Sequence, residues 1–266
     1  MSYETLIWDV EDGVGTITLN RPERLNAWNE QFGLDLKTVV EEEAAQDDAV
    51  RAVLITGAGR GFSSGADLKE QGAGALLDDG RPDTRRILHE VYHPILLGIR
   101  HMEKPVVAAV NGPAVGIGCS LALACDLIIA AESAYFGLAF VNIGLMPDGG
   151  STAFVPAAVG KARAFQLAFL GERVPALQAL EWGLINKVVA PESLSKEAHD
   201  LAAKLAKGPT RSYAGSKKAL NRMLYGDLEG QLDLEAELQH QLVRSDDFAE
   251  GVSAFVEKRE ASFKGS

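Results

Sequence analysis

Short runs of aliphatic residues recur along the first half of the chain and predict a set of buried strands. Residues 15–20 alternate apolar and polar side chains, which is typical of a strand with one face toward the core. Three further runs are continuously apolar, which is typical of strands buried on both faces. These runs cover 50–56, 106–110 and 127–130. Helical spacing of apolar residues over 29–43, and a short apolar segment over 119–125, predict helices between the strands. The alternation predicts an α/β layered core.

The last quarter of the chain has a different pattern, because the strand-like runs stop near residue 190. Four segments with helical spacing follow, at 191–207, 209–224, 227–244 and 246–262. We therefore expect a core over residues 1–190 and a helical region over 191–266, which packs on the core or on another subunit. Residues 72–83 have no clear period, and we expect a loop there, either a lid or a plain surface insertion.

The composition narrows the class of protein. With 266 residues, 47% of them hydrophobic, the chain is long enough for one large domain or for one domain with a helical appendage. A net charge of -11 argues against nucleic-acid binding, which needs a basic face. No uncharged apolar run reaches the ~18 residues of a membrane span, and the first ten residues do not have the pattern of a signal peptide. Cys119 and Cys125 lie in an apolar segment and are expected to be buried thiols. We expect a cytoplasmic protein with neither a membrane nor a nucleic-acid partner.

The segment His89-Glu90-Val91-Tyr92-His93 matches the zinc-protease pattern H-E-x-x-H, in which two histidines four apart share one face of a helix. Pro94 follows directly and disfavours helical geometry at His93. His101 does not have the spacing of the extended metalloprotease pattern. We therefore expect two ordinary helix-surface or interface histidines and no metal site.

The segment Gly61-Phe62-Ser63-Ser64-Gly65 matches the G-x-S-x-G pattern of a nucleophile elbow. An elbow needs a strand that runs directly into the nucleophile turn, with an acid and a histidine later in the chain. Here residues 57–61 separate the strand from Ser63, and the later histidines, His199 and His240, lie in the predicted helical tail. A serine hydrolase is therefore a rival hypothesis and not the main one.

Two glycine-rich bends carry more information than either motif. Residues 61–68 and 106–126 each take a strand into a bend and then toward a helix. Both bends can point backbone N–H groups at one shared spot. Two such donors form an oxyanion hole, which stabilises a carbonyl oxygen as it gains charge. The pair predicts an enzyme that works on acyl groups.

An ordered series of motifs over nearly the whole chain resembles the crotonase superfamily, also called the enoyl-CoA hydratase/isomerase family. The motifs are Asn20-Arg21-Pro22 with Leu25-Asn26-Ala27, residues 62–69, residues 104–118, Cys125-Asp126 with Phe136-Gly137, Gly144-Leu145-Met146-Pro147 with Gly149-Gly150, residues 179–186, and Glu250-Gly251 with Ala254-Phe255 and Lys258-Arg259. The resemblance implies an α/β fold, a spiral of ββα units with a C-terminal helical trimerisation region. It also implies homotrimers or dimers of trimers, and acyl-CoA thioester substrates. Coenzyme A is then part of the substrate, and no separate cofactor is expected.

The resemblance also implies roles for individual residues. The oxyanion donors would be the N–H groups of Ala66 and Ile117, and the helix that starts near residue 118 would add its positive end. The residues implied along the substrate are Asp67, Leu68, Gly116, Phe140, Arg24 and Lys258. Asp67 would orient its loop and would not act as a base. Lys258 would meet the CoA phosphates from a neighbouring subunit, and Arg24 would contact the nucleotide end.

The sequence departs from the family pattern at the two glutamates that hydratases use to position and deprotonate water. These positions hold Ser120 and Phe140, and neither side chain can act as a carboxylate acid or base. Asp148, in Met146-Pro147-Asp148-Gly149-Gly150, matches the acidic position of the enoyl-CoA isomerases and of the ring-modifying isomerases of phenylacetate catabolism. Turn chemistry alone would also explain a Pro-Asp-Gly sequence. In an apolar acyl tunnel, however, a carboxylate gains a raised pKa and becomes a better base.

The sequence therefore predicts an acyl-CoA double-bond isomerase. The reaction would move the double bond of a 3-enoyl-CoA to position 2, or act on a ring-containing acyl-CoA, with Asp148 as the proton carrier. The alternatives are a hydratase with altered water activation, a non-catalytic acyl-CoA-binding subunit, and a thioester hydrolase that uses Ser63.

Overall fold

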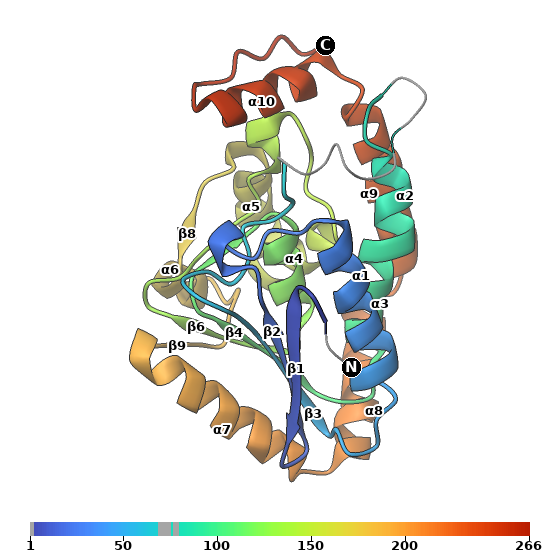
Figure 1. Ribbon diagram of the computed structural model, residues 1–266, viewed down its shortest axis with the longest axis vertical. Helices are drawn as coiled ribbons and strands as arrows, with labels where there is room; N and C mark the ends of the chain where they lie inside the picture. Colours follow the sequence, from blue (N-terminus) through green and yellow to red (C-terminus); the bar gives the residue numbers. More distant parts are fainter. Residues whose placement is uncertain (1–2, 69–75, 77–79) are drawn as a thin grey trace.

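A six-stranded sheet forms the centre of the computed structural model, which describes residues 3–68, 76 and 80–266 (Figure 1). Its strand order is β1-β2-β3-β4-β6-β9. The strands are β1 (Leu6–Glu11), β2 (Val14–Leu19), β3 (Ala52–Gly57), β4 (Val106–Val110), β6 (Leu127–Ala131) and β9 (Lys187–Val189). Only β1 and β2 pair antiparallel, and every other neighbouring pair is parallel. The four predicted strands are confirmed to within two residues.

A second, smaller sheet lies beside the first and contains β5 (Pro113–Val115), β7 (Tyr135–Gly137) and β8 (Val174–Pro175). After β4 the chain enters β5 of the small sheet and then a helix, and after β6 it enters β7 before the next long helix. This passage from large sheet to small sheet to helix is the predicted spiral of ββα units, which is therefore confirmed.

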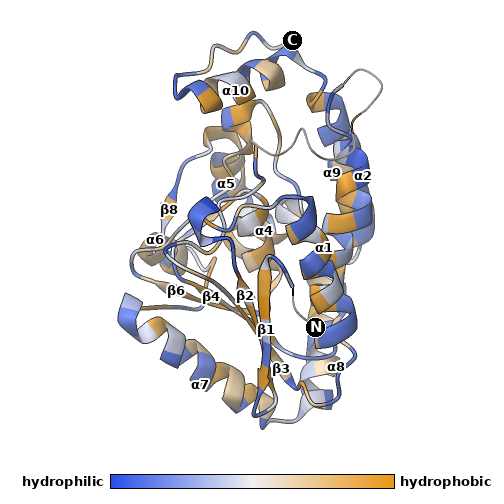
Figure 2. Ribbon diagram, viewed as in Figure 1, coloured by the Kyte–Doolittle hydropathy of each residue, from blue (hydrophilic) through white to orange (hydrophobic). Residues whose placement is uncertain are grey.

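The helices of the core differ in how much of their surface is apolar (Figure 2). They are α1 (Glu30–Thr38) with its π-helical extension Val39–Ala44, α2 (Thr84–Ile87) with its π-helical extension η4 (Leu88–Tyr92), α3 (His93–His101), α4 (Ile117–Ala124), α5 (Ser151–Leu170) and α6 (Ala176–Glu181). All eight residues of α4 are buried. A helix that is apolar on every side belongs inside the fold, and α4 occupies that place at the end of the second glycine bend.

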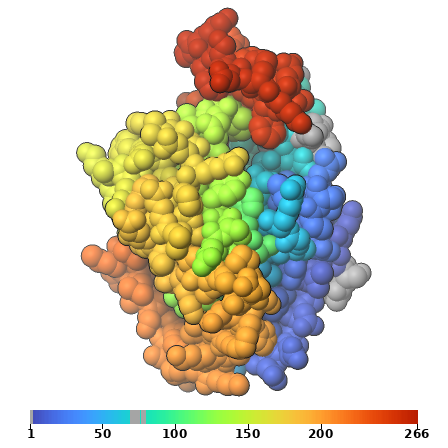
Figure 3. All heavy atoms as spheres, turned by 90° about the vertical axis from the view of Figure 1, so that its left-hand side faces the viewer, coloured from blue at the N-terminus to red at the C-terminus, as the bar shows by residue number. Residues whose placement is uncertain are grey.

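Four helices complete the chain, as predicted: α7 (Leu194–Ala206), α8 (Thr210–Leu224), α9 (Leu228–Leu242) and α10 (Asp246–Glu257). α7 packs on β3 and β4, so the first tail helix covers the main sheet. α9 packs on α2 and α5, and α10 packs on the 3-10 turn η5 (Phe140–Ile143) and projects at one end of the molecule (Figure 3). α10 ends earlier than predicted because Lys258 adopts a left-handed conformation with φ of 58°.

The expectation that Pro94 breaks the helix at His93 is wrong. His93 has helical backbone angles, with φ of -59° and ψ of -45°, and η4 continues directly into α3. A proline clashes with the carbonyl four residues earlier and leaves that carbonyl without its helical donor. Here the π-helical turn of η4 precedes Pro94, and Lys37 Nζ donates to the freed Glu90 carbonyl at 2.9 Å.

Two smaller expectations can also be compared with the structure. Cys119 and Cys125 are free and buried, as predicted, and burial raises the pKa of both thiols to about 12. Among the residues described, no helix combines the length and apolar character that crossing a bilayer demands. Most of the predicted loop at 72–83 lies outside the described residues.

Candidate active site

The two glycine bends lie directly against each other. Ser63 and Ala114 pair as a parallel bridge, in which Ser63 N donates to Pro113 O at 2.9 Å and Val115 N donates to Ser63 O at 2.9 Å. Gly65 has φ of +93°, and a Cβ at this position would lie 2.9 Å from Val115 O. A side chain would therefore force the bends apart, which explains the glycine.

This arrangement brings Ala66 and Ile117 to the wall of one cavity. Ala66 lies opposite Trp28 in a parallel bridge. The hydrogen bonds of this bridge run from the Trp28 N–H to the Gly65 carbonyl and from the Asp67 N–H to the Trp28 carbonyl, so they do not use the N–H of Ala66. Ile117 is the first residue of α4, so its N–H is one of the groups that a helix leaves without an internal acceptor. Within the described part of the chain, neither N–H donates to a main-chain carbonyl. The geometry is that of two free donors, and their catalytic role stays a prediction.

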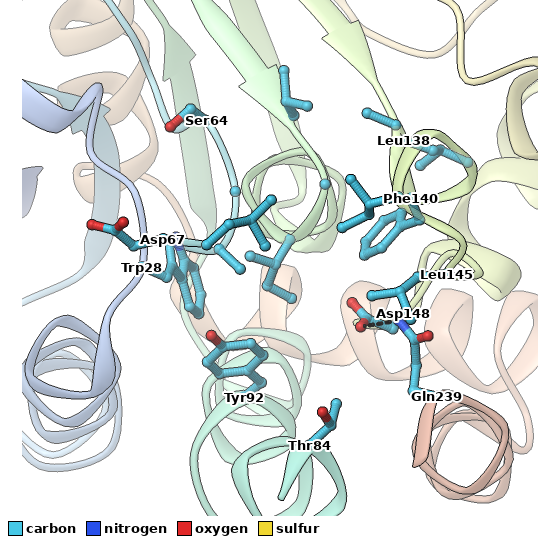
Figure 4. A pocket seen from close by; sticks show the side chains of 18 of the residues that line it. Trp28, Ser64, Asp67, Thr84, Tyr92, Leu138, Phe140, Leu145, Asp148 and Gln239 are labelled. Atoms are coloured by element: carbon cyan, nitrogen blue, oxygen red, sulfur yellow. Dashed lines mark hydrogen bonds between the residues drawn. The ribbon is translucent and has the colours of Figure 1, made fainter. Parts of the chain in front are cut away.

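The cavity has a volume of about 570 Å³, within the range of small-molecule sites, and its wall is mainly apolar (Figure 4). Seven of the predicted site residues line it: Ala66, Asp67, Leu68, Gly116, Ile117, Phe140 and Asp148. Arg24 and Lys258 are exposed and are not part of its wall. The structure therefore brings the predicted chemistry together but leaves the two predicted coenzyme contacts outside the cavity.

Asp148 is the carboxylate in this wall that has no ionic partner. Three carboxylates line the cavity within the described residues. Asp67 pairs with Arg21 at 3.2 Å and Glu30 pairs with Arg86 at 3.3 Å, whereas Asp148 forms no ion pair in the part of the chain that the structure describes. Burial raises the pKa of Asp148 to about 7. A carboxyl group with such a pKa is divided between acid and base near neutral pH.

A tight turn places Asp148 beside one of the two donors. Gly149 has φ of +64°, and a Cβ there would lie 2.4 Å from Ile117 Cδ1. Ser120 Oγ, on α4, donates to the Asp148 carbonyl at 2.8 Å. The Pro-Asp-Gly-Gly turn therefore packs on the first turns of α4, and the Ser120 side chain holds this turn in place.

Two residues of α9 that were not predicted complete the site. Gln239 Nε2 donates to Asp148 Oδ2 at 2.7 Å and to the Met146 carbonyl at 2.9 Å. Glu235 Oε2 accepts from the N–H of Gly150 at 2.7 Å. Asp148 Oδ1 is buried and has no hydrogen-bond partner among the described residues. One carboxylate oxygen is thus held by Gln239, while the other is buried without a hydrogen-bond partner among the described residues.

A signal for these residues is present in the sequence. The buried positions of α9 follow helical spacing and include Leu228, Leu232 and Ala236, yet Glu235 and Gln239 occupy the same stripe and are fully buried. A polar residue at a core position requires a partner. The sequence does not identify that partner, because Asp148 lies 91 positions away.

Ser63 is poorly placed for a nucleophile. It is fully buried, and its Oγ donates to the Asn26 carbonyl at 2.8 Å. The serine of this segment that lines the cavity is Ser64. The G-x-S-x-G match is therefore a consequence of the glycine bend.

Comparison with known proteins agrees with this geometry. A family model described as enoyl-CoA hydratase/isomerase matches residues 9–266. The 1,2-epoxyphenylacetyl-CoA isomerase of Escherichia coli (strain K12) is 43% identical over 262 residues, 98% of this chain and 99% of its own. A probable enoyl-CoA hydratase of Rhodobacter capsulatus is 42% identical over 265 residues, with both chains covered completely. The crystal structure of an enoyl-CoA hydratase from Mycobacterium avium subsp. paratuberculosis K-10 superimposes with a TM-score of 0.89 at 40% identity, covering 99% of this chain and 100% of that one.

A site of this kind, with two backbone donors at the meeting point of two ββα turns, defines an acyl-transforming enzyme. The chain belongs to the enoyl-CoA hydratase/isomerase family, the crotonase superfamily, as its motifs predicted. Binding of an acyl-CoA is consistent with this family. The names of the relatives include both hydratases and isomerases, so the reaction has to be argued from the site.

Proposed function

We propose that the protein is an acyl-CoA double-bond isomerase in which Asp148 carries the transferred proton. The observation that carries this proposal is the single carboxylate without an ion pair among the described residues of the cavity wall, which Ala66 and Ile117 also line. A shift of a double bond needs one group that takes a proton from one carbon and returns it to another, whereas hydration also needs a water to be activated. Ser120 and Phe140 supply no second carboxylate.

In the proposed reaction, Asp148 Oδ1 removes a proton from carbon 2 of a 3-enoyl thioester. The electron pair moves into the thioester, and its oxygen becomes an enolate held by the N–H groups of Ala66 and Ile117. The carboxylic acid of Asp148 then returns the proton at carbon 4, which gives the conjugated 2-enoyl thioester. Each backbone donor of this kind contributes about 3 kcal/mol of transition-state stabilisation.

Gln239 serves this reaction as a positioning residue. Its amide holds Oδ2, which leaves Oδ1, the oxygen without a hydrogen-bond partner among the described residues, as the atom that takes the proton in the proposed reaction. The same hydrogen bond lowers the pKa of Asp148 while burial raises it, and burial is the larger effect. The balance keeps enough of the base form at neutral pH for proton removal to begin.

The substrate class follows from the wall of the cavity. The wall contains the apolar or aromatic side chains of Trp28, Tyr92, Leu138, Phe140 and Leu145, which favour an apolar acyl group (Figure 4). A ring-containing acyl-CoA is a second substrate type, supported by the relative named 1,2-epoxyphenylacetyl-CoA isomerase. Both types use the same proton carrier and the same two donors.

The test supplies a 3-enoyl-CoA and, separately, a 2-enoyl-CoA to the purified protein. We expect the first to become a conjugated thioester with no change of mass, detected by absorbance and mass spectrometry. Asp148→Asn removes the base and is expected to lower kcat by at least a hundredfold, while the exposed Asp48→Asn serves as the control with unchanged turnover.

Other outcomes would support the rival functions. Water addition to the 2-enoyl-CoA that persists in Asp148→Asn would refute the proposal and indicate a hydratase with a different water-activating group. Equal ligand binding by wild type and Asp148→Asn, with no turnover of a straight-chain or ring-containing thioester by either, would indicate a non-catalytic binding subunit.

A further inference from the structure

The two histidines of the H-E-x-x-H segment lie against α9, where Asp233 joins them. One ligand atom from each of His89, His93 and Asp233 lies within 4.8 Å of the other two. His89 Nδ1 is 3.5 Å from Asp233 Oδ1, and the two imidazole rings have centroids 5.0 Å apart at an interplanar angle of 71°. None of the three lines the cavity around Asp148, so the cluster is separate from the site described above.

His93 is the buried member of the cluster. Its residue is 4% exposed, and its Nε2 is buried with no hydrogen-bond partner in the described part of the chain. A buried polar atom without a partner calls for an explanation, and an ion between these side chains would supply one.

We propose that His89, His93 and Asp233 bind a divalent transition-metal ion of the zinc type. Two imidazole nitrogens and one carboxylate oxygen form a ligand set that zinc uses, with the fourth position left for water or another small ligand. This proposal departs from the sequence-based expectation of no metal, which depended on a helix break at His93 that does not occur.

The observed geometry needs only side-chain movement to close around an ion. In a tetrahedral zinc site neighbouring ligand atoms lie about 3.3 Å apart. His93 is fixed by burial, whereas the side chains of His89 and Asp233 are 37% and 68% exposed and can rotate toward it. Glu90 occupies the position that holds the general base in the H-E-x-x-H pattern of zinc proteases. Here its carboxylate pairs with Arg86 at 3.1 Å. The cluster is therefore a binding site and not a protease centre.

An ion at this position would join two walls of the substrate cavity. η4 carries Leu88 and Val91, which line the cavity, and α9 carries Gln239, which holds Asp148. Metal binding would fix α9 against η4 and so hold Gln239 in place. This consequence for catalysis rests on the proposed function, whereas the binding of the ion does not.

The test is a titration of the full-length, chelator-treated protein with zinc chloride, followed by calorimetry. We expect one ion per chain, and His89→Gln and Asp233→Asn each to weaken binding at least tenfold. Both changes are at exposed side chains, so the variants are expected to fold. His101→Gln, at the exposed far end of α3, is the matched control and is expected to bind as the wild type does.

A second measurement separates this site from adventitious zinc binding. Zinc is expected to raise the melting temperature of the wild type and of His101→Gln, but not of Asp233→Asn, because an ion that binds only the folded state stabilises it. Equal affinity in wild type and Asp233→Asn, or no saturable binding by the wild type, would overturn the proposal. Neither readout depends on turnover, so a failure here leaves the isomerase hypothesis standing.

Discussion

The two carboxylate oxygens of Asp148 have different surroundings, and this difference allows the role of Gln239 to be tested. Gln239→Leu removes the amide donor at 2.7 Å and keeps most of the side-chain volume. Because this hydrogen bond favours the charged form, we expect the pKa of Asp148 to rise. The midpoint of the pH–rate profile should then move upward, and kcat at neutral pH should fall about tenfold or more, as for other positioned bases.

The control for this prediction is Gln241→Leu, because Gln241 lies on the same helix, is exposed and bonds only to Glu237 among the described residues. A structural role alone would lower stability in Gln239→Leu without moving the pH midpoint. An unchanged midpoint with reduced kcat would therefore contradict the positioning role.

The raised pKa of Asp148 also has a consequence for stability. The carboxyl titrates near 3.8 when unfolded and near 7 when folded, so the folded state binds this proton more tightly. The stabilisation that this proton gives the folded state is fully present below about pH 4 and is lost as the pH rises through about 7. The free energy of unfolding is lowered by on the order of 4 kcal/mol between these two limits. Asp148→Asn is therefore expected to gain unfolding free energy relative to wild type between pH 5 and pH 8, as measured by urea denaturation. If the unfolding free energies of Asp148→Asn and wild type differed by the same amount at pH 5 and at pH 8, burial would not raise the pKa of Asp148.

At the scale of elements, α9 supports the beginning of α5. Glu235 accepts from the N–H of Gly150 at 2.7 Å and from that of Thr152 at 3.1 Å. These groups belong to the first turn of α5, where N–H groups have no internal acceptor. Glu235→Leu leaves them buried and is expected to lower the free energy of unfolding by about 2–3 kcal/mol. Glu235→Gln should lose less, and the exposed Glu229→Leu should change it little. Chemical denaturation of the three variants would check this order.

The elements differ in how well the sequence predicts them. The continuous apolar runs of β3, β4 and β6 predict strands because burial on both faces leaves no alternative pattern. β1 was missed because it is mostly exposed, and β8 because two residues are too few to show a period. The helix through Pro94 was missed because the preference of a residue before proline is only a local tendency, and here η4 runs directly into α3.

The candidate site also contains parts that the sequence predicts and parts that it does not. The two bends could be predicted because glycine-rich turns are local features of the sequence, and the family resemblance then implied Ala66 and Ile117 as the backbone donors. The partners of Asp148 could not, because Gln239 reaches it only when α9 packs on the core. Local chemistry is visible in the sequence, whereas the pairing of distant polar groups requires the fold.

At the scale of the whole molecule, several large apolar side chains are exposed on the tail helices. On α8, Leu220 is 58% exposed and Met223 is 83% exposed. A cluster of exposed apolar residues marks an interaction surface more often than a free one. We therefore expect copies of the chain to pack on this face, as in the homotrimers or dimers of trimers that the family resemblance implies, measured by light scattering after size exclusion. Leu220→Asp with Met223→Asp is expected to shift the population toward monomers, whereas a monomeric wild type would contradict the expectation.

The position of Gln239 near the end of the chain has a consequence for the protein while it is being made. The oxyanion donors and Asp148 all lie in the first 150 residues, and they leave the ribosome long before α9 does. Until α9 packs behind it, the turn that carries Asp148 lacks both of its rear supports. In a nascent chain this turn therefore acquires its contacts with Gln239 and Glu235 only when synthesis is almost complete.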